Sequence, residues 1–297
     1  PYNVYSDGLK VFTTIDSRMQ KYAEEAVYQH VARYLQPAFD KENKPKPSSP
    51  YSDKLTPQQI RNILNRSITQ SERWRTMKAA GCTPEEIKEA FRKKIEMTVF
   101  TYHGDIDTLM SPLDSIRYYK GFLRSGFMSM DPKTGAVKAY VGGLDYPHFM
   151  YDMVSLGRRQ VGSTIKPFLY SLAMENGFTP CDYAPNRQQT YIVAGRPWTP
   201  RNVSHARYGQ MVPLKWGLAQ SNNWISAYLM SKLNPNQFVQ ILHDFGIHNP
   251  DIHPSMSLCL GPCEVSVSEM VSAYTVFANH GIRTAPMFVS RIEDNEG

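Results

Sequence analysis

Apolar and polar positions alternate in three short segments of the chain, and this period of two predicts β-strands. The first segment covers residues 9–15, and the other two, residues 127–130 and 136–141, are close enough in sequence to form a hairpin. Asp16 follows the first segment, where its carboxylate can cap a helix that runs to about residue 35.

Helical periodicity dominates the second half of the chain. It predicts long helices at about residues 162–176, 213–232, 235–245 and 264–280. A further helix begins at Thr83, where Thr, Pro and Glu occupy the N-cap, first and third positions of a capping box, and it should end near residue 96. Strands at the outside with helices between them predict the α+β class.

Composition, together with the family likeness described below, divides the chain into three segments, residues 1–36, 37–110 and 111–297. The first part of the middle segment, from residue 37 to about residue 57, is rich in Pro, Ser and Lys. We expect it to form a mobile loop. A basic helical block follows, with ten Lys or Arg against five Glu in residues 54–96. Such a block could dock on a partner, although a charge run is more often a solvated helix face.

A serine lies three residues before a lysine at the expected start of the helix at residue 162. The text is Gly162-Ser163-Thr164-Ile165-Lys166-Pro167. Residues three apart share one helix face, so the lysine amine can take the serine's proton if its own pKa is lowered. About one Ser-x-x-Lys match is expected by chance, and the plainer interpretation is an N-cap serine beside a solvated lysine.

A second element, Ser221-Asn222-Asn223, gives Ser-x-Asn 58 residues after Ser163. Together the two motifs resemble the transpeptidase domain of class A penicillin-binding proteins, most nearly the bifunctional 1A type. Other stretches add to the likeness: Thr13-Thr14-Ile15-Asp16, Asp131-Pro132-Lys133-Thr134-Gly135-Ala136-Val137, and the text from Glu264 to Gly281.

The resemblance implies an antiparallel sheet of about five strands flanked by helices and a serine acyl-enzyme mechanism. Ser163 would attack the D-Ala-D-Ala end of a peptidoglycan stem peptide, and Lys166 would accept its proton. Ser221 would relay a proton to the leaving group, and Asn223 would hydrogen-bond both the substrate backbone and Lys166. Three further residues are predicted to contact substrate: Gly162, Asn202 and Trp224. Trp224 is more often a core residue than a contact.

The family's third motif, Lys-Thr-Gly or Lys-Ser-Gly on a strand, does not occur between Asn223 and Gly297. Lys133-Thr134-Gly135 precedes Ser163, and its Asp-Pro opening predicts a reverse turn. We therefore expect the chain to end inside the transpeptidase domain. Because it lacks the third motif, we expect catalysis by this chain on its own to be impaired. On the family pattern, residues 1–36 would follow a glycosyltransferase domain and a membrane anchor.

Composition suits a folded chain, with 41% hydrophobic residues and a net charge of +6. No nucleic-acid motif accompanies this charge. Four cysteines are too few and scattered for a disulfide framework, although Cys259 and Cys263 could form a short bridge. The histidines at 243, 248 and 253 repeat every five residues and do not share a helix face, so we predict no metal site and no cofactor.

Three alternatives to a transpeptidase stay open. A serine beta-lactamase or DD-carboxypeptidase would share the first two motifs, but the base that activates water cannot be identified. A penicillin-sensor domain would be acylated without processing peptide, and a noncatalytic wall-binding module would not be acylated at all. The resemblance further implies beta-lactams as ligands, cell-wall synthesis proteins as partners, and a place outside the cytoplasmic membrane, periplasmic where an outer membrane exists.

Overall fold

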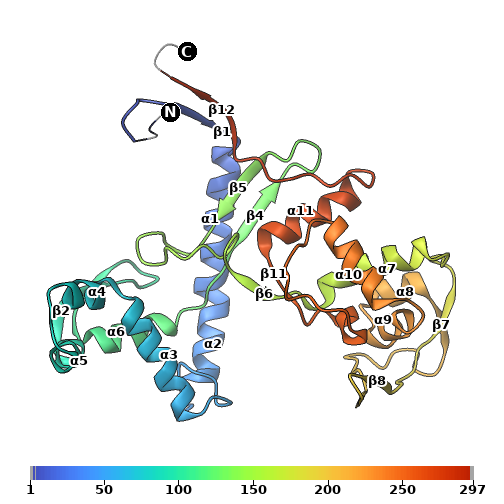
Figure 1. Ribbon diagram of the computed structural model, residues 1–297, viewed down its shortest axis with the longest axis horizontal. Helices are drawn as coiled ribbons and strands as arrows, with labels where there is room; N and C mark the ends of the chain where they lie inside the picture. Colours follow the sequence, from blue (N-terminus) through green and yellow to red (C-terminus); the bar gives the residue numbers. More distant parts are fainter. Residues whose placement is uncertain (1–2, 4, 295–297) are drawn as a thin grey trace. The chain divides into compact units, whose positions relative to one another are not determined.

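The computed structural model describes residues 3 and 5–294, and contacts divide the chain into two compact units (Figure 1). The first unit comprises Pro1–Gln20, Gly126–Tyr140 and Tyr151–Gly297, and the second comprises Lys21–Ser125 and Val141–Met150. The segments 1–36, 37–110 and 111–297 stay a prediction, because they rest on composition and likeness, whereas these units are defined by contacts.

A helical stretch begins directly after Asp16. Its carboxylate accepts hydrogen bonds from the backbone N–H groups of Arg18 and Met19 at 3.0 and 3.1 Å, which confirms the predicted cap. Helix α1 (Ser17–His30) continues through a π-helical turn (Val31–Leu35) into α2 (Gln36–Asn43). The loop expected from residue 37 is therefore wrong at its start, because Pro37 lies in the first turn of α2, where proline is tolerated.

The second unit contains four further helices and one hairpin. They are α3 (Pro57–Gln70), α4 (Glu72–Ala79), α5 (Pro84–Arg92), α6 (Pro112–Lys120), β2 (Ile95–Val99) and β3 (Ile106–Met110). Thr83 forms the predicted capping box with Glu86. Helix α5 ends earlier than residue 96 because the antiparallel hairpin starts at Ile95. An aromatic cluster centred on Phe100 packs beside this hairpin, with ring centroids 5.1 Å apart from Phe149 and 5.4 Å from Phe122.

Strands of the first unit pair antiparallel. The pairs are β1 (Lys10–Thr13) with β12 (Val289–Glu293), β4 (Phe127–Met130) with β5 (Val137–Val141), β6 (Arg158–Gln160) with β11 (Glu264–Ser266), β7 (Tyr183–Pro185) with β10 (Met211–Pro213), and β8 (Tyr191–Val193) with β9 (Arg196–Trp198). The predicted hairpin is β4–β5. The segment Lys133-Thr134-Gly135 forms its turn. The Asp131 carboxylate there accepts hydrogen bonds from the backbone N–H groups of Lys133 and Thr134, both at 2.9 Å.

The single sheet of about five strands implied by the family is not formed by the described residues, whose strands pair only in twos. Hydrogen bonds nevertheless connect the β1–β12 pair to the hairpin. Thr14 Oγ1 donates to Val137 O at 2.8 Å, and Val137 N donates to Met287 O at 3.0 Å. Pro286 lies just before this crossing and has no N–H to extend a regular ladder. The α+β class is confirmed.

Helices of the first unit surround one hydrophobic core. They are α7 (Lys166–Glu175), α8 (Leu214–Ala219), α9 (Asn223–Met230), α10 (Pro235–Asp244), α11 (Val267–Ala278) and the 3₁₀ turn η3 (Met256–Leu260). Phe168, Ile225, Phe238 and Leu242 have no exposed surface in this core. The helix predicted at residues 213–232 is wrong in its continuity, because α8 and α9 are separate helices.

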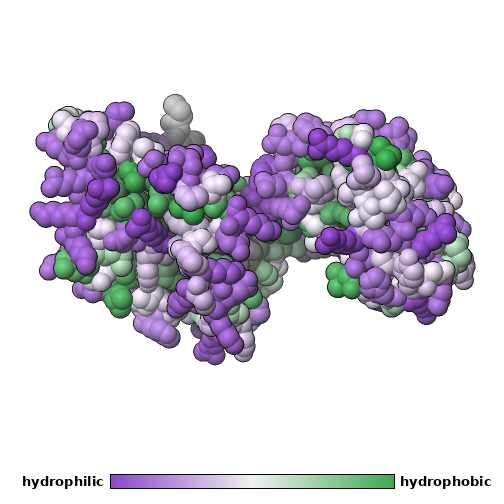
Figure 2. Space-filling view, turned by 90° about the horizontal axis from the view of Figure 1, so that it is seen from below, coloured by the Kyte–Doolittle hydropathy of each residue, from purple (hydrophilic) through white to green (hydrophobic). Residues whose placement is uncertain are grey.

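The molecular surface is mainly hydrophilic on the face that Figure 2 displays, with apolar residues in patches between polar ones. Exposed apolar side chains of this kind are normal on folded chains. Among the residues that the structure describes, no helix combines the length and apolarity needed to cross a membrane.

Gly135 provides a test of how the hairpin packs. Its φ is +79°, and a Cβ would lie 2.2 Å from the Ala285 carbonyl oxygen. Gly135→Ala should therefore lower the free energy of unfolding by about 2–4 kcal/mol, from the left-handed backbone plus the clash. Urea unfolding followed by circular dichroism measures this change.

Gly177→Ala is the matched control, because Gly177 has φ +88° but a Cβ added there would meet no atom within 4 Å. It should lose only about 1 kcal/mol. Equal losses in the two variants would contradict close packing of the turn against Ala285.

Candidate active site

Ser163 lies in a 3₁₀ turn, η2 (Gly162–Ile165), that leads directly into α7. The β6–β11 pairing continues into this turn, since Val161 N donates to Cys263 O at 3.0 Å and Gly162 N donates to Gly261 O at 2.9 Å. The sheet edge thus fixes the backbone on which the serine stands. The predicted helix start is correct in place, although its first turn is 3₁₀ rather than α.

Two glycines make this close backbone approach feasible. A Cβ on Gly261 would lie 2.2 Å from the Gly162 carbonyl oxygen, and both glycines have positive φ, +67° and +55°. Spacing in the sequence gave no indication that Gly261 belongs to the site. Gly162 has a backbone role here, and its contact with substrate stays a prediction.

The two residues of the first motif have opposite environments. Ser163 is exposed, and its side chain forms no hydrogen bond with the described part of the chain. The Lys166 side chain is only 1% exposed. Lys166 N donates to the Ser163 carbonyl, so the two residues occupy one tight turn. The serine hydroxyl faces solvent, where a substrate can reach it, while the amine is enclosed by protein.

The Lys166 amine donates to three oxygens of the second motif. They are Ser221 O at 2.5 Å, Ser221 Oγ at 3.1 Å and Asn223 Oδ1 at 2.7 Å. These contacts confirm that the fold brings the two motifs together. None of the three oxygens belongs to a carboxylate, so the ammonium is solvated by neutral dipoles only. Burial lowers the pKa of Lys166 from 10.5 to about 8.

Ser221 occupies the break between α8 and α9. Its φ of +49° is unusual for a residue with a side chain, and such backbone strain persists only where the surroundings enforce it. Asn222 then starts α9, because its Oδ1 accepts from Trp224 N and Ile225 N at 2.9 and 3.1 Å. The break directs both oxygens of Ser221 at the Lys166 amine.

The Asn223 side chain is held in one orientation. Its Nδ2 donates to Arg201 O at 2.8 Å, which leaves Oδ1 for the Lys166 amine. Asn223 N donates to Asn202 Oδ1 at 2.9 Å, so Asn202 supports the second motif. A direct contact of Asn202 with substrate stays a prediction.

Trp224 lies in the core beneath this segment. It is 3% exposed, its Nε1 donates to Pro200 O at 3.0 Å, and its ring packs edge-on against Tyr208 at 5.2 Å. These contacts support the stretch that carries Arg201 and Asn202. The predicted contact of Trp224 with substrate is not tested by this geometry.

Several residues near the site were not predicted to belong to it. The Asn186 side chain, fully buried, accepts from Asn222 Nδ2 at 2.9 Å, and Tyr274 OH donates to the Thr164 carbonyl at 2.7 Å. Cys259 is fully buried and interacts electrostatically with Lys166; burial raises the pKa of its thiol to about 12. A periodic pattern finds none of them, because each acts through a contact distant in sequence.

The cysteines and histidines are not assembled into other sites. Cys259 and Cys263 are free thiols, and no disulfide joins them. His243 and His248 have ring centroids 5.8 Å apart, but the described residues contain no cluster of three side chains able to hold a metal ion.

Two family models match the chain. Residues 46–123 match the penicillin-binding protein middle domain, and residues 125–296 match the penicillin-binding protein transpeptidase domain. The chain is 28% identical over 327 aligned residues to penicillin-binding protein 1A of Neisseria lactamica, which covers 99% of this chain and 40% of that protein. It is 31% identical over 176 residues to penicillin-binding protein 1A of Pseudomonas aeruginosa, covering 59% and 21%.

Solved structures agree in fold. Penicillin-binding protein 1A from Haemophilus influenzae aligns with a TM-score of 0.64 at 23% identity, covering 98% of this chain and 45% of that one. The PonA1 protein from Mycobacterium tuberculosis, in complex with penicillin V, aligns with a TM-score of 0.52 at 22% identity, covering 80% and 63%. The chain spans about 40% of the length of curated relatives such as the Neisseria protein.

Asn222 tests whether the helix break depends on side-chain hydrogen bonds. Asn222→Ala should lower the free energy of unfolding by about 2–3 kcal/mol, because it removes the cap of α9 and leaves the buried Asn186 Oδ1 without its donor. Chemical denaturation measures the loss.

Asn234→Ala provides the control. Asn234 caps α10 through a bond to Asn236 N, but it is exposed and has no buried partner. Its replacement should cost only about 1 kcal/mol. If the two variants lost the same stability, the buried Asn186–Asn222 pair would contribute nothing to the site.

Proposed function

Because the chain belongs to the penicillin-binding protein transpeptidase family, we propose that it is part of a peptidoglycan DD-transpeptidase in which Ser163 forms the acyl-enzyme. One observation carries this proposal: a lysine in the turn of Ser163 is buried, lacks a carboxylate partner and is hydrogen-bonded by Ser221 and Asn223. A solvated lysine beside an N-cap serine would be neither buried nor hydrogen-bonded by the second motif.

Burial suits Lys166 to the role of general base. A lysine with a pKa of 10.5 is almost entirely protonated at pH 7, whereas a pKa of about 8 leaves about one molecule in ten with a neutral amine. The neutral fraction therefore rises about 300-fold relative to an exposed lysine. Neutral dipoles around the amine preserve this effect, since a carboxylate would favour the charged form.

Acylation begins when Ser163 Oγ attacks the carbonyl carbon of the penultimate D-Ala of a stem peptide. The hydroxyl proton passes to Lys166 Nζ as the C–O bond forms. Ser221, hydrogen-bonded to Lys166 through its hydroxyl, relays a proton to the departing amine. The peptide C–N bond breaks, free D-Ala leaves, and an ester joins the remaining peptide to Ser163.

Deacylation completes the cross-link. An amine of a neighbouring stem peptide attacks the ester carbonyl, loses its proton to the same relay, and releases Ser163 with its hydroxyl restored. The Ser163 N–H is one donor to the oxyanion in both steps. On the family pattern the second donor comes from the Lys-Thr-Gly strand, and losing one such donor costs about 100- to 1,000-fold in rate.

Beta-lactams acylate the same serine in this proposal, since they present a strained amide in place of the terminal dipeptide. The whole protein would be a bifunctional glycosyltransferase and transpeptidase, membrane-anchored, with this part outside the cytoplasmic membrane and in contact with other wall-synthesis proteins. These features of the longer protein rest on likeness to the 1A-type relatives.

Benzylpenicillin tests the nucleophile. Incubation with the 297-residue chain should add one penicillin per molecule by intact mass, and Ser163→Ala should abolish the adduct. Ser231→Ala, which changes an exposed serine that bonds only to its own helix, should keep it. An adduct that survives Ser163→Ala would place the nucleophile elsewhere.

The lifetime of the adduct separates the alternatives. A transpeptidase should hold the penicilloyl group for many minutes, whereas a beta-lactamase would release it and hydrolyse excess penicillin. If no adduct forms, the same measurement on a chain extended by a Lys-Thr-Gly strand distinguishes a missing oxyanion donor from a noncatalytic module.

The pH dependence of acylation tests Lys166. Because the neutral amine is the reactive form and its pKa is about 8, the second-order acylation rate should rise about tenfold per pH unit below pH 7 and level off above about pH 9. Stopped-flow measurement with a chromogenic beta-lactam follows this profile.

Lys166→Arg is the control variant, since a guanidinium stays charged throughout this range. It should acylate at least about 100-fold more slowly at pH 8. A flat wild-type profile from about pH 6 to 9 would exclude Lys166 as the base.

A further inference from the structure

A small cavity lies between α3 and α6 of the second unit, and nothing in the proposed reaction uses it. Its volume is about 220 Å³. We call it the α3–α6 pocket and define it by its lining residues: Ser67, Ser115, Ile116, Tyr119, Lys120 and Arg124.

The charges of the α3–α6 pocket are uncompensated. Lys120 and Arg124 both line it, and neither forms an ion pair within the described part of the chain. Arg117, on the same helix as Lys120, is by contrast paired with Asp114 at 3.0 Å. Burial, followed by repulsion from Arg124, lowers the pKa of Lys120, and burial also lowers the pKa of Arg124. Both side chains are exposed, so two neighbouring cations border the pocket with no anion among the described residues to balance them.

Aromatic contacts fix the position of Arg124. Its guanidinium lies 4.0 Å from the ring centroid of Phe149, a cation–π distance. The Phe149 ring packs edge-on against Tyr119, with centroids 5.7 Å apart. Tyr119 in turn accepts a hydrogen bond from Phe100 N at 3.1 Å. The cation is therefore held on a packed surface, not on a free side chain.

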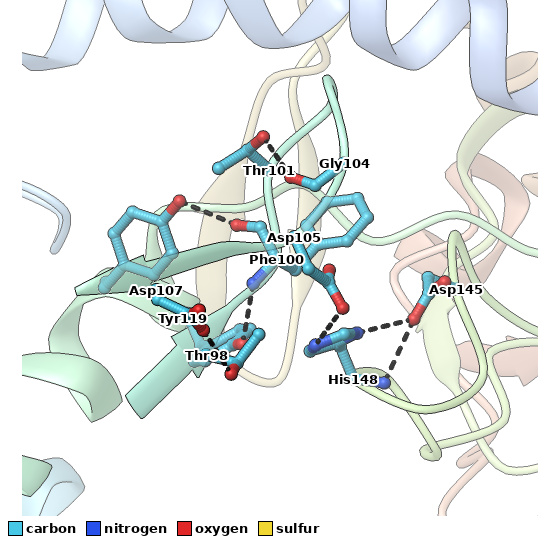
Figure 3. A network of polar contacts seen from close by, with 10 residues as sticks. Thr98, Phe100, Thr101, Gly104, Asp105, Asp107, Tyr119, Asp145 and His148 are labelled. Carbon is cyan, nitrogen blue, oxygen red and sulfur yellow. Dashed lines mark hydrogen bonds and ion pairs between the residues drawn. The ribbon is translucent and has the colours of Figure 1, made fainter. Parts of the chain in front are cut away.

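A polar network anchors this aromatic wall (Figure 3). His148 stacks on Tyr119 with centroids 6.2 Å apart, and its ring lies between two carboxylates. Its Nδ1 is 2.7 Å from Asp145 Oδ1, and its Nε2 is 3.5 Å from Asp105 Oδ2. Figure 3 shows Asp105 and Asp145 converging on the His148 ring. Both carboxylates contact His148, which packs on Tyr119. The aromatic side chains beside the pocket are therefore preorganised in the absence of a ligand.

The serine hydroxyl groups of the pocket are already engaged. Ser67 Oγ donates to Ile63 O at 3.0 Å, and Ser115 Oγ donates to Pro112 O at 2.9 Å. Their protons are therefore unavailable, and the N–H groups of Lys120 and Arg124 are the charged donors that face the cavity. A ligand that satisfies both needs at least two anionic oxygens, which phosphate supplies to a guanidinium in bidentate form.

The helices beside the pocket extend its positive field. Six exposed cations lie on or just before α3 and α4, none in an ion pair with the described residues, and Glu72 is the one acidic side chain between residues 54 and 80. The six are Lys54, Arg61, Arg66, Arg73, Arg75 and Lys78. A field of one sign over a surface raises the local concentration of anions and speeds their association.

We propose that the α3–α6 pocket binds a phosphate group, with Lys120 and Arg124 as its charge partners, and that the cations of α3 and α4 bind further phosphates of the same polyanionic ligand. The proposed function places this part of the chain outside the cytoplasmic membrane, where phosphate groups belong to lipid headgroups or to phosphodiester polymers. The shared chemistry is an array of phosphates, of which one enters the pocket.

Inorganic phosphate tests the pocket itself. Added to the 297-residue chain at constant ionic strength, it should raise the Tm saturably, because it binds only the folded state. Lys120→Ala and Arg124→Met should each raise the apparent Kd at least about tenfold, because each removes one charge-assisted contact to the phosphate. Met at 124 retains packing against Phe149, so loss of binding is separable from loss of fold.

Lys133→Ala is the matched control, since Lys133 is an exposed lysine without an ion pair among the described residues of the first unit. It should leave the Kd unchanged. A wild-type response that does not saturate, or one that all three variants retain, would overturn the proposal. Neither result depends on Ser163, so the transpeptidase assignment is tested separately.

The source of the phosphate is distinguished by two further probes. Cosedimentation with vesicles of phosphatidylglycerol in phosphatidylcholine, lost in Lys120→Ala, would identify a lipid surface. Binding of soluble polyglycerol phosphate, with no vesicle binding, would identify a polymer. Vesicle and polymer binding that ignore Lys120 and Arg124 while depending on Arg61 and Arg66 would contradict a role for the pocket.

Discussion

Burial of the Lys166 amine is the constraint on which the site depends. An ammonium withdrawn from water needs hydrogen-bond acceptors, and here Ser221 and Asn223 supply three. Because these acceptors come from the break between α8 and α9, the same contacts join α7 to α9. A group that would be costly to bury alone thus connects two segments that are distant in sequence, and its pKa falls into the range useful for proton transfer.

Strained backbone conformations place the hydrogen-bond acceptors of the Lys166 amine. Ser221 adopts a positive φ, and Gly162 and Gly261 approach each other more closely than any residue with a Cβ could. Asn222 and the buried Asn186 stabilise the strained turn from the core side. The core of the first unit therefore serves as the rigid support on which an exposed Ser163 and an enclosed Lys166 keep their separate environments.

The second unit uses charge differently. His148 lies between Asp105 and Asp145, so its surroundings are compensated, whereas Lys120 and Arg124 face a cavity without a carboxylate. The Arg117–Asp114 ion pair shows that α6 can pair its cations when acids are near. Lys120, Arg124 and the basic surface of α3 and α4 are exposed on this unit, where a polyanionic ligand could contact them.

The sequence alone determined the α+β class, the Asp16 and Thr83 caps and the hairpin turn, because each depends on residues adjacent along the chain. It also identified the two motifs that the fold brings into contact. Only the tertiary structure decided that the helix at 213–232 breaks at Ser221, that Lys166 is buried, and that Gly261, Asn186 and Cys259 border the site. Periodicity records local preference, whereas burial, backbone strain and a shifted pKa arise from contacts between segments that meet only on folding.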